Sequence, residues 1–420
     1  MLTIKNQLFK TAITVIVLLF AINYKMNGNQ IVLSMSGKIK TLNQAIQIAQ
    51  PYDTIIIEKG TYASPNTLIE KPLTLIGKDF PKIDGQYKDE VITILSNDVT
   101  ITGIEVCNSK TGSMKDYAGI RVYRSSNVKL INNRIVNTFF GIYLSDATDI
   151  LVQKNYLSGA LSGTSNGGNG IHLWKCERIS IFNNYIQGHR DGIYFEFAKH
   201  SLIKNNYSTL NYRYGLHFMF SDNDTYISNT FINNGTGVAV MYTKGVQMYH
   251  NTFKDNWGAS AYALLLKDIS RSIIKGNKFE NNTVGITMEG SSKIVMTDND
   301  FIRNGYALKM MANCIEDTVT GNNFSGNTFD MSTNGELQMN LIAKNYWNKY
   351  DGYDLNKDGI GDIPYRPVSL YSQITEQMPY TLMLMHSFIV ELMDKVEKGI
   401  PTIVPENLKD DQPLMKKIKR

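Results

Sequence analysis

The chain has 420 residues and a formal charge of +5, with 43 Lys and Arg against 38 Asp and Glu. Lys5, Lys10 and Lys25 lie in the first 30 residues, which hold no acidic residue, so the rest of the chain carries only +2. A body this close to neutral excludes a nucleic-acid partner held through many phosphate contacts.

Residues 1–26 have the pattern of an export signal. Lys5 and Lys10 precede an uncharged apolar run at residues 11–22, which is too short to cross a bilayer comfortably. We predict a signal peptide and an exported chain, with a buried helix or an uncleaved anchor as alternatives. Next, residues 41–49 predict a short amphipathic helix in which Thr41 and Gln44 form a capping box, and strands follow at 54–57 and 73–76.

Two residue series repeat in step along the middle of the chain. One is Gly or Ala followed by an aliphatic residue, at positions 119, 141, 170, 192, 215, 237, 263, 285 and 307. The other is Asn at positions 133, 155, 184, 206, 229, 251, 277, 299, 322 and 345. Most spacings are 22 or 23 residues, and both series lengthen to 29 and 26 residues at the same two places.

This repeat predicts an all-β fold, a right-handed parallel β-helix of rungs of about 22 residues over 31–350, with a short N-terminal capping helix. Stacked Asn side chains would hydrogen-bond from rung to rung at a fixed turn. In the strand after each Gly, alternate side chains should point inward; we expect this of Ile171, Leu173, Ile193, Phe195, Phe197, Leu216, Phe218, Phe220, Val238 and Val240.

The outward positions of the same strands form the first candidate site. They are His172, Trp174, Glu196, His217, Met219 and Met241. Thioether and imidazole groups suit copper, especially Cu(I). His172 and His217 lie two rungs apart, about 10 Å, so one ion would not bridge both. The alternative is a partner-binding surface of Met and aromatic residues without a metal.

The second candidate site is an Asp/Gly-rich loop at 351–367. Asp354, Asn356, Asp358 and Asp362 occupy positions 1, 3, 5 and 9 of a calcium-loop pattern, with Gly359 at position 6. Position 12 is Tyr365 instead of the usual Glu. We therefore expect either bound calcium or a loop of Asx turns that locks the end of the β-helix.

Catalysis is not favoured. Asp191, Glu196, Asp222 and Asp224 are the acids near the first site, but no set of three acids repeats on adjacent rungs, and Asp191 is expected at a turn. Residues 368–420 predict a helical C-terminal segment, apolar at helical spacing between 376 and 398. Such a segment could pack as a cap on the last rung, dock to a membrane partner, or do both.

At these residues the chain resembles the NosD family. The resemblance rests on Gly-Ile-His-Leu-Trp at 170–174, Asp-Gly-Ile-Tyr-Phe-Glu-Phe at 191–197, Tyr-Gly-Leu-His-Phe-Met-Phe-Ser-Asp at 214–222 and Gly-Val-Ala-Val-Met-Tyr at 237–242. It continues through Leu-Leu-Leu-Lys-Asp-Ile at 264–269 to the loop at 353–367. Ala replaces Gly at 263 and 307, and Asn356 stands where the family often has Asp.

This resemblance implies a periplasmic accessory protein that is not an enzyme. NosD-like proteins act with an ABC-type permease and ATPase of the inner membrane. They support maturation of the copper centre of nitrous oxide reductase, an enzyme of denitrification, with a copper-chaperone lipoprotein as donor. The expected partners are therefore the transporter, the chaperone and the reductase. The alternative is a secreted β-helix that binds or cleaves polysaccharides.

Overall fold

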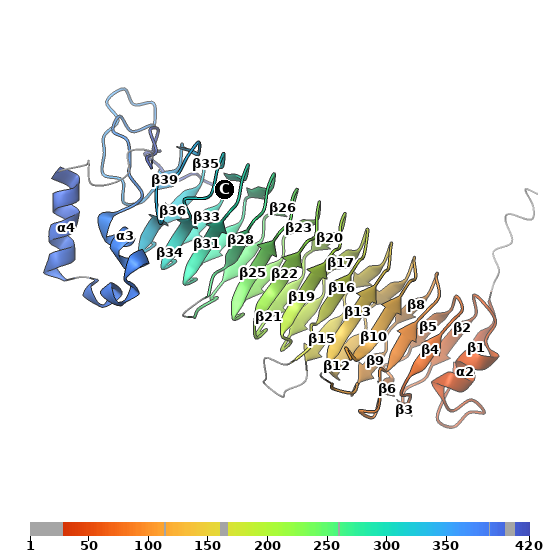
Figure 1. Cartoon of the computed structure of the whole chain (residues 1–420). Coiled ribbons are helices and arrows are strands. Elements are labelled where there is room, and N and C mark those ends of the chain that lie inside the picture. Colours follow the sequence, from red (N-terminus) through yellow and green to blue (C-terminus); the bar gives the residue numbers. More distant parts are fainter. Residues whose placement is uncertain (1–27, 113–114, 160–166, 259–260, 386, 400–407) are drawn as a thin grey trace, which may run out of the picture.

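The computed structural model describes residues 28–420 except 113–114, 160–166, 259–260, 386 and 400–407. The described chain forms a long parallel β-helix with three sheets along its length (Figure 1). The predicted export signal at 1–26 lies outside the described residues. Among the helices described, none has the length and apolar character needed to cross a membrane.

The 14-stranded sheet A runs through β1 (Gln30–Leu33), β2 (Thr54–Ile57), β5 (Thr74–Gly77), β8 (Thr100–Thr102), β11 (Lys129–Ile131), β14 (Leu151–Gln153), β17 (Ser180–Phe182), β20 (Leu202–Lys204), β23 (Thr225–Ile227), β26 (Gln247–Tyr249), β29 (Ile273–Lys275), β32 (Val295–Thr297), β35 (Thr318–Thr320) and β38 (Leu341–Ala343). The 13-stranded sheet B runs through β3 (Thr61–Ala63), β6 (Lys82–Asp84), β9 (Glu105–Cys107), β12 (Arg134–Thr138), β15 (Tyr156–Gly159), β18 (Tyr185–Gln187), β21 (Tyr207–Thr209), β24 (Thr230–Ile232), β27 (Thr252–Lys254), β30 (Lys278–Glu280), β33 (Asp300–Ile302), β36 (Asn323–Ser325) and β39 (Tyr346–Trp347).

The 12-stranded sheet C, which carries the Gly series, runs through β4 (Thr67–Ile69), β7 (Ile92–Ile94), β10 (Ala118–Tyr123), β13 (Phe140–Ser145), β16 (Ile171–Trp174), β19 (Asp191–Glu196), β22 (Tyr214–Met219), β25 (Thr236–Met241), β28 (Leu264–Lys267), β31 (Val284–Glu289), β34 (Tyr306–Met310) and β37 (Phe329–Ser332). The helices are α2 (Leu42–Ile48), α3 (Leu370–Gln377), the 3-10 helix η1 (Pro379–Leu384) and α4 (Phe388–Gly399). The predicted parallel β-helix is confirmed.

The Asn series forms a continuous hydrogen-bonded ladder. From Asn133 to Asn322, each backbone N–H donates to the side-chain oxygen of the next Asn at 2.8 or 2.9 Å. Each side-chain nitrogen donates to the same oxygen at 2.9–3.2 Å. A second ladder, which we did not predict, joins Asn211, Asn234, Asn256, Asn282, Asn304 and Asn327. Both ladders satisfy buried polar groups at the turns, as the interior requires.

The interior is filled by aliphatic and aromatic columns. Aromatic rings stack inside sheet B from Phe231 through Phe253, Phe279, Phe301 and Phe324 to Trp347. The predicted inward positions of sheet C are buried, with two exceptions. Phe197 and Phe220 are 46% and 43% exposed, because the backbone leaves the strand there with φ of 53° and 52°. The alternation that predicted them inward applies only while the chain is extended.

The two ends of the β-helix are closed differently. At the N-terminus, the predicted helix is present as α2, and Thr41 Oγ1 accepts from Gln44 N at 3.2 Å. At the C-terminus, Asp410 is fully buried and takes the next position of the Asn ladder. It accepts from Lys344 N, Asn345 N and Trp347 Nε1 at 2.9–3.0 Å. We expected 368–420 to be helical, but residues 408–420 run along the last rungs without helical structure.

Helices α3 and α4 pack on the outer face of sheet C. They therefore cover the side of the last rungs, whereas the predicted cap would have covered the end of the β-helix. Tyr371 and Val390 pack with Val284, Tyr306 and Phe329 of β31, β34 and β37. Tyr306 Oη donates to Thr375 Oγ1 at 2.9 Å, and Lys309 pairs with Glu376 at 2.7 Å. The helices therefore extend the outer face that carries the first candidate site.

Candidate functional site

The first candidate site lies on the outer face of sheet C, midway along the β-helix. Trp174, Glu196, Met219 and Met241 occupy successive strands β16, β19, β22 and β25 in direct register. All four side chains are partly exposed. We call these four residues the Met column. Its two thioethers are neighbours one rung apart, about 4.8 Å between backbones.

The histidines of the site are not exposed, which corrects our expectation of a solvent-facing His column. His172 and His217 are only 7% and 5% exposed. The His172 ring stacks on Tyr143 and Tyr194, with centroids 4.3 and 4.9 Å apart. Burial lowers the pKa of His172 to about 3, so this ring is neutral. Outward-facing positions are buried here because aromatic neighbours on adjacent rungs cover them.

His217 lies in a buried polar cluster with Asp191 and Arg213. Its Nδ1 is 3.7 Å from Asp191 Oδ2, and Arg213 Nε donates to Asp191 Oδ1 at 2.8 Å. Burial would raise the pKa of Asp191, but the hydrogen bonds and positive charge of Arg213 outweigh it and hold that pKa below its usual value. Asp191 begins strand β19 and is fully buried, so our expectation of a turn was wrong.

His217, Met219 and Met241 are the residues of this site that could bind a copper ion. Neither ring nitrogen of His217 has a hydrogen-bond partner among the described residues, although both are buried. Tyr194 Oη donates to Met219 Sδ at 3.6 Å, and the Tyr194 ring lies 4.9 Å from the His217 ring. Within the described ranges, no group of three His, Cys, Asp or Glu could hold a metal. An imidazole and two thioethers nevertheless form a donor set that suits Cu(I).

Exposed aromatic side chains border the Met column, and the sequence interpretation missed them. Phe197, Phe220 and Tyr242 stack with centroids 5.3 and 5.1 Å apart and planes 9° and 16° apart. A similar stack of Tyr156, Tyr185 and Tyr207 lies on sheet B. Positive φ at residues 197, 220 and 242 turns the first stack outward. Within each stack the ring faces cover one another, which leaves less flat ring surface on which a sugar could stack.

The structure gives no support to calcium in the loop at 351–367. The oxygens of Asp354 accept from the backbone nitrogens of Asp358 and Gly359 at 3.2 and 2.9 Å. Asp362 Oδ2 accepts from Leu355 N at 2.7 Å, and Asp358 Oδ1 accepts from Ile360 N at 2.8 Å. Asn356 Oδ1 likewise accepts from Asp358 N. These oxygens are used in turns within the loop, which matches the second of our two interpretations.

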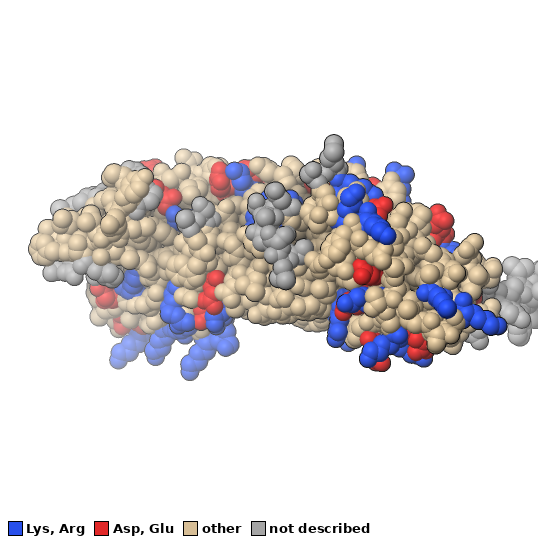
Figure 2. Space-filling model, turned by 90° about the horizontal axis from the view of Figure 1, so that it is seen from below, with Lys and Arg blue, Asp and Glu red and all other residues tan. Residues whose placement is uncertain are grey.

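The C-terminal helices present an exposed apolar surface. Tyr380, Met383 and Phe388 are 86%, 89% and 76% exposed, and Met378, Leu384, Ile389, Leu392 and Val396 are 41–58% exposed. In the view of Figure 2, the extreme C-terminal end shows little charged surface, while charged side chains gather on the lower side of the same half and toward the N-terminal end. An apolar surface of this kind is typical of a binding site for a protein or a membrane. We call these eight residues the helical patch.

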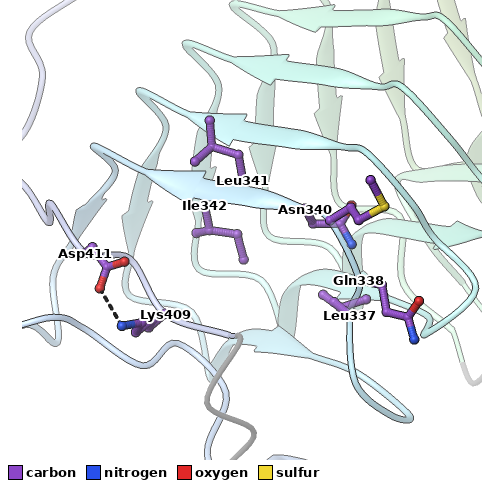
Figure 3. Close-up of a pocket in the computed structure, with 8 residues that line it drawn as sticks. Leu337, Gln338, Asn340, Leu341, Ile342, Lys409 and Asp411 are labelled. Carbon is purple, nitrogen blue, oxygen red and sulfur yellow. Dashed lines mark ion pairs between the residues drawn. The ribbon is translucent and has the colours of Figure 1, made fainter.

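A shallow pocket of about 590 Å³ lies where sheet A ends (Figure 3). Its lining includes Leu337, Asn340 and Leu341 around β38, and Lys409 and Asp411, which pair at 3.0 Å. The pocket therefore lies between the last strand of the sheet and the chain terminus that closes the β-helix. None of the predicted site residues lines it.

Comparisons with solved structures bear on the fold alone. The chain is similar to the Dettilon tailspike protein, with 12% identity, a TM-score of 0.57, and coverage of 76% of this chain and 70% of that one. It is also similar to PfbA, a surface adhesin of Streptococcus pneumoniae, with 12% identity, a TM-score of 0.51, and coverage of 73% and 88%. Both likenesses agree with a parallel β-helix.

Sequence comparisons give the family. The model described as "Periplasmic copper-binding protein (NosD)" matches residues 158–358, which include the Met column and its cluster. A "Probable ABC transporter binding protein NosD" of Stutzerimonas stutzeri is 26% identical over 385 residues, covering 85% of each chain. One of the same name from Pseudomonas aeruginosa is 26% identical over 376 residues, covering 85% of this chain and 87% of that one. Residues 158–358 of the chain, which hold the Met column, therefore match the NosD family domain, and the two relatives extend the similarity to 85% of the chain.

Proposed function

We propose that this protein is a periplasmic accessory protein that helps to assemble the copper centre of nitrous oxide reductase without being an enzyme itself. In this proposal it docks on an ABC-type permease and ATPase and meets a copper-chaperone lipoprotein and the reductase through its outer face. The family model's description as periplasmic and copper-binding and the relatives' names as transporter-binding proteins support it. In this proposal copper is the cargo that passes between the partners.

One observation carries the proposal. Met219 and Met241 are paired on adjacent strands and partly exposed, and two residues before Met219 on β22 lies His217, whose ring nitrogens are unpartnered in the described structure. A soft cation delivered to the surface would meet thioethers first and an imidazole next. Trp174, Glu196 and the exposed Phe220 and Tyr242 surround the pair and offer the Met-rich and aromatic contacts that protein interfaces prefer.

Replacing Met219 and Met241 together by Leu tests the copper role. Leu keeps the apolar volume and removes the thioether, so a docking surface would survive and a copper site would not. We expect the copper content of the reductase, measured by metal analysis of the purified enzyme, to fall at least tenfold.

Two further variants complete the experiment. Met35→Leu changes a 56% exposed methionine at the N-terminal end and should leave copper loading unchanged. Met219→Lys with Met241→Lys also alters the surface itself. Normal loading with the Leu pair but not with the Lys pair would show a docking surface without copper ligands, and normal loading with both would contradict the proposed role of this face.

The helical patch is the proposed contact with the transporter. Replacing Tyr380, Met383 and Phe388 by Ser removes three of its most exposed apolar side chains without touching Tyr371 or Thr375, which attach the helices to the β-helix. We expect at least a tenfold loss of affinity for the detergent-solubilised permease–ATPase complex. Tyr87→Ser with Met35→Ser, at 57% and 56% exposure, is the matched control. Unchanged affinity of the triple variant would exclude the patch as the contact.

A further inference from the structure

The two histidines of sheet C differ in which ring nitrogen is available. They occupy the same column two strands apart, since Tyr194 pairs with His172 on one side and with His217 on the other. Each has a different polar group beside Nδ1: an amide for His172 and a carboxylate for His217. In a neutral imidazole, the partner of one nitrogen decides which nitrogen carries the proton.

The lone pair of the neutral His172 ring is on Nδ1, where it accepts a hydrogen bond. Asn169 Nδ2 lies 2.9 Å from His172 Nδ1, and an amide nitrogen can only donate, so Nδ1 accepts and Nε2 carries the proton. The ring also lies between Tyr143 and Tyr194. His172 therefore has no free lone pair to offer a cation.

His217 has the opposite arrangement. Its Nδ1 faces the carboxylate of Asp191 at 3.7 Å, and a carboxylate can only accept, so the proton belongs on Nδ1. Asp191 is itself fixed, because Arg213 Nε and Tyr214 N both donate to its Oδ1, at 2.8 and 3.3 Å, and Arg213 Nη2 donates to Oδ2. This leaves the lone pair on Nε2, which is buried and has no partner among the described residues.

We propose that Asp191 is a positioning residue that holds the proton of His217 on Nδ1 and so presents Nε2, together with the Met219 thioether, to a soft monovalent cation. This inference rests on the proposed function, because that function supplies copper as the cation. The inference goes beyond the proposed function because it names His217, and not His172, as the ligand. It also assigns a role to the buried carboxylate of Asp191. Carboxylate–histidine–metal arrangements lose about 10–100-fold in metal affinity when the carboxylate is removed.

The test measures tautomer and affinity separately in the full-length mature protein. Nitrogen-15 spectra of histidine-labelled protein without metal should show the Nδ1–H form for His217 in the wild type and its loss in Asp191→Asn. Titration with Ag(I) alone, used as the probe, should show at least tenfold weaker binding for Asp191→Asn. His172→Gln should bind Ag(I) like the wild type.

A second variant separates positioning from folding. Arg213→Lys keeps a cation beside Asp191 and leaves the carboxylate beside Nδ1, so the tautomer and the Ag(I) affinity should be kept within about threefold if Asp191 acts on His217, as a second-sphere role requires. The proposal is overturned if His217 carries its proton on Nε2 in the wild type. It is also overturned if Asp191→Asn binds Ag(I) as tightly as the wild type or more tightly, or if Arg213→Lys loses as much affinity as Asp191→Asn. The reductase assay with the Met219 and Met241 variants tests the proposed function independently of these spectra.

Discussion

Asp410→Ala is expected to open the C-terminal end of the β-helix. Asp410 is the acceptor at which the Asn ladder ends, and its removal leaves the buried donors Asn345 N and Trp347 Nε1 and the partly buried donor Lys344 N without this acceptor. A buried donor without a partner costs about 1–3 kcal/mol, so the two buried donors alone should destabilise the last rung by roughly 2–6 kcal/mol. Hydrogen exchange of residues 341–347 should accelerate at least a hundredfold.

The effect should remain at one end, since each rung of a solenoid contacts mainly its neighbours. Exchange in β16 or β19 should therefore stay unchanged. Asp410→Asn keeps one acceptor oxygen and should fall between the Ala variant and the wild type. Asp411→Ala is the control: its side chain is 59% exposed and pairs with the partly exposed Lys409, so the change should cost less than about 0.5 kcal/mol. Slow exchange in Asp410→Ala would mean that the chain terminus does not close the end.

Asn229→Ala should break the ladder in the middle. Asn229 Oδ1 accepts from Asn206 N and Asn206 Nδ2 at 2.9 and 3.0 Å, and its Nδ2 donates to Ile203 O at 2.9 Å and to Asn251 Oδ1 at 3.0 Å. The Ala variant leaves two buried donors and one acceptor of neighbouring rungs unpaired. We expect a loss of about 3 kcal/mol in the free energy of unfolding, measured by chemical denaturation.

Thr230→Ala is the matched control for the ladder. Thr230 directly follows Asn229 in the chain, but its side chain is partly exposed and lies outside the core. It should change the unfolding free energy by less than about 0.5 kcal/mol. Equal effects of the two substitutions would show that the ladder contributes no more than an ordinary surface position.

The parallel β-helix could be predicted from the sequence because its two residue series have a structural cause that acts locally. Each Asn needs only the Asn one rung away, so a spacing of 22 or 23 residues is visible without any knowledge of the rest of the fold. The register of Trp174, Glu196, Met219 and Met241 follows from the same spacing. The helix at the N-terminus was equally accessible, since its capping box is contained in four residues.

Other features depend on contacts between distant residues, and the sequence does not reveal these. Asp410 joins the ladder across 65 residues, so nothing beside it in the chain indicates its role. Phe197 and Phe220 turn outward because each of these two residues has a positive φ, which the alternation pattern cannot show. The second Asn ladder was visible as an Asn five residues after each member of the first series from position 206 to position 322, but we did not use that signal.

The fold, the register of the outer face and the resemblance to the NosD family can all be predicted from the sequence, because a strict repeat converts position in the chain into position in space. Which members of the outer face meet the solvent is visible in the structure alone. His172 and His217 are outward by periodicity yet buried by the rings of Tyr143, Tyr194 and Tyr214, whereas Met219 and Met241 remain partly exposed. Burial depends on the size and direction of neighbouring side chains, which no spacing in one chain records.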